Sequence, residues 1–219
     1  MKLFFQISLI ILSLSIYGAD KFDKDNMPKE EIKGDVKNGS QLVSTCIACH
    51  GQDGNSINSD WPKLAGQNQR YLYEQLQYFK NGDRRNALMN TVTPYLNSLS
   101  NDDIRDIAAY YASMEVSIGR AKNDIEMLEL GEALYRNGNL KKGIPACTAC
   151  HSVYGEGNSQ AGFPSVAGQQ VGYLVSSLKA YRSKERNAGE SSLVMQAIAE
   201  NLTDNEIDAL ANYMHGLYQ

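Results

Sequence analysis

The sequence predicts an all-α protein of two tandem domains, because one unit of about a hundred residues occurs twice. The first copy contains CIACH at 46–50, WPKLAGQ at 61–67 and SNDDIRDIAAYY at 100–111. The second contains, in the same order, CTACH at 147–151, FPSVAGQ at 163–169 and TDNEIDALANYM at 203–214. Apolar residues in both copies recur with the helical period, and no strand-like alternation of useful length occurs.

Residues 1–19, MKLFFQISLIILSLSIYGA, resemble a secretory signal peptide. Their apolar run is about fourteen residues, shorter than the roughly 20 that span a bilayer as a helix. Cleavage near Ala19 is therefore favoured, although Tyr17 stands where a small residue is preferred and a retained anchor stays open. The first domain is expected over residues 20–118 and the second over 119–219.

A short helix is expected before each cysteine motif, around residues 35–45 in the first domain and 125–135 in the second. Each carries an internal glycine, Gly39 or Gly131. Because glycine costs a helix about 1 kcal/mol relative to alanine, these glycines indicate close helix crossings.

Two further helices are expected in each domain. Middle helices are indicated over 71–79, where Asn81-Gly82 follows as a stop signal, and over 173–181. The last helices show the i, i+3, i+4, i+7 spacing over 104–111 and 207–214. Capping boxes are predicted at the starts of these last helices, formed by Ser100 with Asp103 and by Thr203 with Glu206.

The composition is that of a folded protein, with 42% hydrophobic and 21% charged residues in a chain of 219. A net charge of −4 argues against a nucleic-acid partner. Removing Lys2 with the signal segment would make the mature chain more acidic, with a net charge of −5. Since each domain is small, something besides side chains must fill its centre.

The cysteines supply a candidate for that centre. All four lie in Cys-x-x-Cys-His motifs, which are typical of c-type haem attachment. Cys46, Cys49, Cys147 and Cys150 would form thioethers with two haem c groups. His50 and His151 would be the proximal ligands of the two irons.

Other chemistries fit these motifs less well. A thioredoxin-like redox site needs a βαβ context and would not explain the histidines. A zinc site needs ligands that converge on one metal, whereas the motifs lie about a hundred residues apart. A disulfide within each motif would close a very small loop and stabilise little.

The sixth iron ligand separates electron transfer from catalysis, because a methionine there closes the iron to substrates. Met195 is the candidate in the second domain, eight residues before Thr203. Met89 is the candidate in the first domain, eleven residues before Ser100, which suggests a three-residue insertion in TVTPYLNS. The less favoured alternatives are Met114, which continues the 104–111 apolar stripe, and His215.

The two prolines that follow the histidines have two interpretations. Pro62 and Pro164 punctuate turns, and their carbonyls could also accept the Nδ1 proton of the proximal histidines. Four nearby side chains could reach haem propionates or simply pack: Gln67, Tyr71, Gln169 and Tyr173.

The motifs CIACHGQDGNS, PKLAGQ, LGEALYRNGNLKKGIPACTACH and DIAAYY resemble those of the cytochrome c4 family. Members of this family are dihaem periplasmic proteins made of two class I cytochrome c domains. The resemblance covers nearly the whole chain after residue 19. It implies two small helical domains that each surround one covalently bound haem, with His/Met ligation of both irons.

The resemblance also implies a function and partners. The expected function is electron transfer in the periplasm of a bacterium, from a quinol-cytochrome c oxidoreductase to a cbb3-type terminal oxidase. We expect a monomer that is not itself an enzyme and that associates at most loosely with the membrane. The alternative is a dihaem oxidoreductase, or its electron-transfer subunit, of the sulfur-compound dehydrogenase or peroxidase type.

Overall fold

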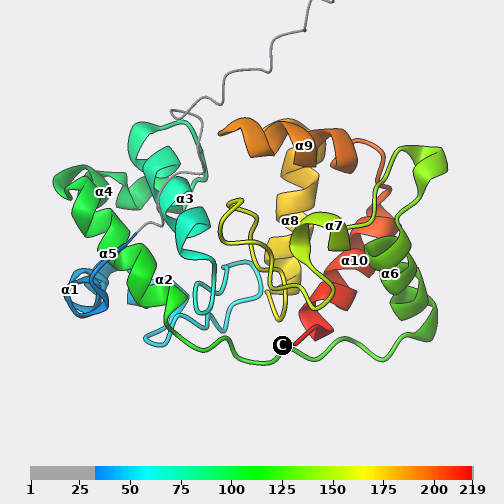
Figure 1. Cartoon of the computed structure of the whole chain (residues 1–219), viewed down its shortest axis with the longest axis horizontal. Helices are drawn as coiled ribbons and strands as arrows, with labels where there is room; N and C mark the ends of the chain where they lie inside the picture. The colour runs from blue at the N-terminus through cyan, green and yellow to red at the C-terminus, as the bar shows by residue number, and fades with distance from the viewer. Residues whose placement is uncertain (1–32, 219) are drawn as a thin grey trace, which may run out of the picture.

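The computed structural model describes residues 33–218, which form two helical domains side by side (Figure 1). Within these residues, two isolated β-bridges are the only strand-like pairings. The prediction of an all-α fold with two tandem domains is confirmed. The signal-peptide prediction for residues 1–19 lies outside the described residues. Among the helices of the described part, none is long and apolar enough to cross a membrane.

The first domain contains five α-helices and one short 3-10 helix within the described chain. In order these are α1 (Val36–Leu42), α2 (Ser44–His50), α3 (Gln69–Asn81), η2 (Met89–Val92), α4 (Thr93–Ser98) and α5 (Asn101–Ala112). The expected middle helix is confirmed as α3, and Gly82 ends it in the left-handed conformation. The helix expected around 35–45 is shorter, because α1 ends before Val43 and a second helix, α2, begins after it.

The second domain repeats this order with two differences. Its elements are α6 (Ile125–Asn137), η3 (Leu140–Lys142), α7 (Thr148–His151), α8 (Val171–Arg182), α9 (Glu190–Ala199) and α10 (Asp204–Gly216). The 3-10 helix η3 has no counterpart between α1 and α2. The single helix α9 stands where the first domain has η2 and α4. The segment between α5 and α6 joins the domains and holds no helix (Figure 1).

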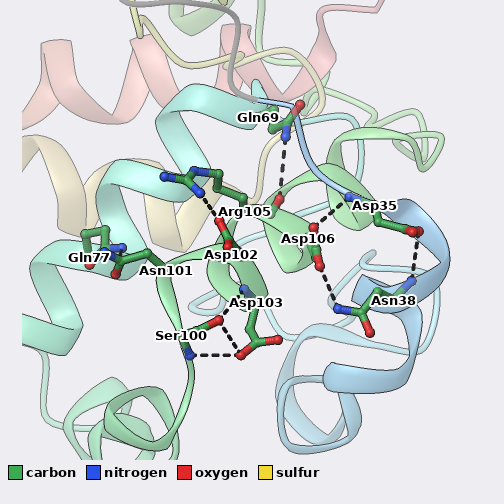
Figure 2. Close-up of polar contacts among 10 residues, drawn as sticks. All are labelled: Asp35, Asn38, Gln69, Gln77, Ser100, Asn101, Asp102, Asp103, Arg105 and Asp106. Atoms are coloured by element: carbon green, nitrogen blue, oxygen red, sulfur yellow. Dashed lines mark hydrogen bonds and ion pairs between the residues drawn. The ribbon is translucent and has the colours of Figure 1, made fainter.

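In each domain the first and last helices cross closely. A Cβ on Gly39 of α1 would collide with the Asp106 carbonyl of α5, and one on Gly131 of α6 with the Ala209 carbonyl of α10. Each glycine is therefore needed for the crossing, as the sequence predicted. Figure 2 shows that the Asp106 carboxylate also ties α1 to α5, since it accepts from the Asp35 N–H and the Asn38 amide, both at 2.6 Å.

Both predicted capping boxes are present. Ser100 and Asp103 cap α5 reciprocally, and Thr203 and Glu206 do the same for α10. These caps satisfy backbone N–H groups that a helix start leaves without intrahelical partners. Figure 2 shows the first of them.

The two domains have separate hydrophobic cores. The core of the first includes Val43, Leu72, Phe79, Leu96, Ile104, Ile107 and Tyr111. The core of the second includes Leu134, Tyr135, Ile144, Leu174, Leu178, Ile207 and Leu210. No hydrophobic cluster joins the two in the described chain, and polar side chains such as Gln67, Gln169 and Arg186 form hydrogen bonds between them.

Candidate haem-binding sites

Each Cys-x-x-Cys-His motif lies on a short helix at the edge of its domain core. Cys46 on α2 and Cys147 at the start of α7 are half-buried and pack against the cores of their domains. Cys49 is exposed. None of the four cysteines forms a disulfide. All four therefore remain available for thioether bonds.

The environment of the first cysteine of each motif argues against a reactive redox thiol. Burial raises the pKa of Cys46 to about 11 and that of Cys147 to about 11. Reactive thiols in thioredoxin-like sites have depressed pKa values instead, because the thiolate is the nucleophile.

Both histidines are held in the same way by a proline carbonyl. The Nδ1 of His50 lies 2.9 Å from the Pro62 carbonyl oxygen, and that of His151 lies 2.9 Å from the Pro164 carbonyl oxygen. Because a carbonyl only accepts, Nδ1 must carry the proton, which leaves Nε2 with its lone pair. Burial also lowers the pKa of both imidazoles, which favours the neutral form that binds metals.

The two candidate methionines line the same cores as the cysteines. Met89 is the first residue of η2 and Met195 lies within α9, and both are half-buried against their own domain. Met114 also packs on the first core, directly after α5. His215 lies near the end of α10, where its Nδ1 donates to the Gln169 carbonyl at 2.8 Å.

Two arginines that the sequence arguments missed lie between the domains. Arg186 donates to the Tyr71 hydroxyl at 2.6 Å, and Arg84 donates to the Tyr173 hydroxyl at 3.3 Å. Both also donate to the side-chain oxygen of Gln75. The two arginines occupy equivalent places in the repeat, since each backbone N–H bonds the carbonyl six residues before it. In the sequence they lie 102 residues apart, the same offset as Pro62 and Pro164, and this offset was the signal that could have revealed them.

This arginine cluster, formed by Arg84 and Arg186, carries positive charge that the described chain does not neutralise. Among residues 33–218, neither guanidinium has a carboxylate within 4.0 Å. Although burial alone would raise it, the pKa of Tyr173 is lowered by the two guanidiniums. A buried cation of this kind calls for an anion. The donor set therefore fits the carboxylates of a haem.

Gln67 and Gln169 do not point toward this cluster. Each side chain instead bonds the backbone of the opposite domain, Gln67 at Ser165 and Gln169 at Lys63. Of the four side chains left open by the sequence, the two tyrosines contact the arginine cluster and the two glutamines bridge the domains.

Comparisons with known proteins agree with this geometry. A family model described as "Cytochrome c" matches residues 36–115 and again 128–217. Cytochrome c4 from Pseudomonas aeruginosa is 42% identical over 84% of this chain and 90% of its own length. The crystal structure of reduced recombinant cytochrome c4 from Pseudomonas stutzeri matches with a TM-score of 0.79 and 41% identity. The match covers 85% of this chain and 100% of the Pseudomonas stutzeri chain.

The chain belongs to the cytochrome c4 family. It is therefore an electron carrier rather than an enzyme, and its two Cys-x-x-Cys-His motifs fit two covalently bound haem c groups. The chain is also 33% identical, over 78% of each chain, to a thiosulfate dehydrogenase electron acceptor from Thiomonas intermedia. Redox proteins are accordingly its partners.

Proposed function

We propose that this cytochrome c4 carries electrons in the periplasm as part of a respiratory chain. Its donor would be a quinol-cytochrome c oxidoreductase and its acceptor a cbb3-type terminal oxidase. The observation that supports this best is the duplicated site, in which the histidine after each cysteine pair directs Nδ1 to a proline carbonyl at 2.9 Å. Two such sites in one chain suit a carrier that holds one electron at each.

The axial ligands in this proposal are His50 with Met89 and His151 with Met195. When bound, each haem exchanges one electron between ferric and ferrous iron, with no atom transferred. Met89 and Met195 would complete this ligand set and would exclude small ligands from the two irons. The Pro62 and Pro164 carbonyls fix the rings of the two histidines, and they fix which nitrogen carries the proton. Met114 would then serve only in packing.

The arginine cluster would receive the haem propionates in this proposal. Arg84 and Arg186 belong to different domains and share one acceptor, the Gln75 side-chain oxygen, at 2.7 and 3.2 Å. Anionic groups from both sites would therefore meet the same positive field.

Absorption spectroscopy of the purified holoprotein tests the ligand assignment. Met ligation at both irons predicts the near-infrared sulfur-to-iron band of the oxidised protein at two-haem intensity, and no carbon monoxide binding by the reduced protein at neutral pH. Half the band intensity would show that one methionine is wrongly assigned. Stoichiometric carbon monoxide binding would contradict a closed carrier and favour the oxidoreductase alternative.

A second candidate function rests on the Thiomonas relative, which is named as an electron acceptor of thiosulfate dehydrogenase. Stopped-flow reduction of the oxidised protein separates the two candidates. Faster reduction by a purified quinol-cytochrome c oxidoreductase supports the respiratory role. Faster reduction by a thiosulfate dehydrogenase with thiosulfate supports the second candidate instead.

The export prediction has its own test. Mass spectrometry of the native protein should find an N-terminus at Asp20 and a mass increased by two haems. An N-terminus at Met1 would contradict cleavage and indicate a retained anchor.

A further inference from the structure

Each domain contributes one glutamine that bonds the backbone of the other domain, at the residue after the proline whose carbonyl holds the histidine. The Gln169 Oε1 accepts from the Lys63 backbone N–H at 2.8 Å, and its Nε2 donates to the Lys63 carbonyl at 2.9 Å. In the other direction, Gln67 makes the same two bonds to Ser165, at 2.7 and 2.9 Å. The contact between the domains is therefore reciprocal at these positions.

The bonded N–H groups have a special place in the chain. The Lys63 N–H and the Pro62 carbonyl belong to one peptide group, and that carbonyl accepts from His50 Nδ1 at 2.9 Å. A continuous hydrogen-bonded path thus runs from Gln169 of the second domain to His50 of the first. The Ser165 N–H and the Pro164 carbonyl connect Gln67 to His151 in the same way.

Water does not compete for these bonds. Lys63, Gln67, Ser165 and Gln169 are between 5% and 8% exposed. Hydrogen bonds in such surroundings are electrostatically stronger than in water, and bonds arranged in a chain polarise one another. An acceptor on the N–H of a peptide group makes its carbonyl a better acceptor for the histidine proton.

We propose that Gln169 and Gln67 are crossed positioning residues, each of which sets the reduction potential of the haem in the opposite domain. This inference rests on the proposed ligation by His50 and His151. A stronger Nδ1 hydrogen bond makes the imidazole a more basic ligand and stabilises ferric iron, so each glutamine lowers the potential of the haem across the interface.

The substitutions Gln169→Met and Gln67→Met test the proposal, because methionine has nearly the volume of glutamine and no amide. Gln169→Met should raise the potential of the His50 haem and leave that of the His151 haem unchanged. Gln67→Met should do the opposite. A redox titration followed by the NMR signals of each haem measures the two potentials separately.

A second readout follows the histidine protons directly. With 15N-labelled histidine, the reduced holoprotein shows three imidazoles, since the chain has three histidines. In Gln169→Met, the His50 Nδ1–H resonance should move upfield and exchange faster with solvent, while that of His151 stays in place. His215 is excluded as a reporter because it bonds the Gln169 carbonyl.

Matched controls remove other bonds between the domains and leave the two peptide groups untouched. The Gln170 amide donates to the Ser56 carbonyl, and the Asn68 amide donates to the Phe163 carbonyl at 2.5 Å. Gln170→Met and Asn68→Leu should therefore leave both potentials and both Nδ1 resonances as in the wild type.

Three results would overturn the crossed assignment. They are equal shifts at both haems, a shift confined to the domain that carries the substitution, and the same shifts in the controls. A wild-type spectrum without His/Met bands would instead contradict the proposed ligands. Unchanged potentials and resonances in Gln169→Met and Gln67→Met, with His/Met bands intact, would contradict only this inference.

Discussion

The methionine segments of the two domains differ in structure, although both precede the last helix of their domain. Met195 lies inside α9, a helix of ten residues, and the buried Gln196 beside it donates to the Arg186 carbonyl at 2.9 Å. Met89 instead begins the four-residue helix η2. Its backbone N–H bonds the Asn86 side chain at 3.1 Å, which is a local contact on an exposed loop.

The extra residues of the first domain explain part of this difference. The insertion inferred within TVTPYLNS is taken up by α4, which has Pro94 in its first turn and whose Leu96 is only 1% exposed. The inserted residues are thus held in place by a buried leucine of their own helix. A buried bond to the preceding loop therefore fixes the methionine segment of the second domain, whereas an exposed bond within one turn fixes that of the first.

Replacing the two methionines gives the largest expected effect. Met89→Ala and Met195→Ala should each halve the near-infrared band and lower one potential by on the order of 0.1 V, since axial ligands set potentials over a range of about 0.8 V. Met114→Leu is the control and should change neither signal. If Met114→Leu halves the band and Met89→Ala does not, the assignment in the first domain is wrong.

Replacing the crossing glycines asks whether the two domains tolerate overpacking equally. Gly39→Ala and Gly131→Ala each force a Cβ against a facing backbone carbonyl, so each should lower the free energy of unfolding of its own domain by about 1–3 kcal/mol. Urea unfolding measures the loss. Lys37→Ala, an exposed change on α1, should stay within about 0.5 kcal/mol. A neutral Gly131→Ala would show that α6 and α10 can move apart.

The capping boxes should give equal and smaller effects. Ser100→Ala and Thr203→Ala each leave a helix N–H without its side-chain acceptor, at a cost of about 1 kcal/mol. Urea unfolding of the two variants measures the cost in each domain. A clear difference between them would show that the helix starts are equivalent in geometry but not in energy.

The smallest expected effect comes from the contact between Lys142 and Glu206, and it depends on pH. Burial raises the pKa of Glu206, but hydrogen bonds from Lys142 and Thr203 outweigh it and hold that pKa below its ordinary 4.5. The resulting stability is present above pH 4.5 and is lost as the pH falls through the folded-state pKa. Lys142→Met should remove about 0.5 kcal/mol at pH 7 and less at pH 3, as urea unfolding at both pH values would show. An equal loss at both would contradict an ionic contribution.

The parts that the sequence predicted are those with a local signature. Helical spacing located α3, α5, α8 and α10, and the capping boxes marked the starts of α5 and α10. The division of the methionine segment of the first domain into η2 and α4 was not predicted, because it depends on the packing of Leu96 into the core, which is a tertiary contact. The site residues split in the same way.

The cysteines and histidines carry a motif, but Arg84 and Arg186 gain their meaning from partners in the other domain. The bonds of Gln67 and Gln169 join residues 98 and 106 positions apart, which no local pattern encodes. Only the repeat indicated that Gln67 and Gln169 matter, since it places a glutamine at the same point of each domain.

With these reciprocal glutamine contacts the chain resembles a symmetric homodimer whose two subunits are joined by a linker. A polar interface of this kind would hold separate subunits only weakly. The segment between α5 and α6 makes their association intramolecular, with an effective concentration in the millimolar range for a short linker. Covalent continuity thereby replaces the apolar area that a stable dimer would need.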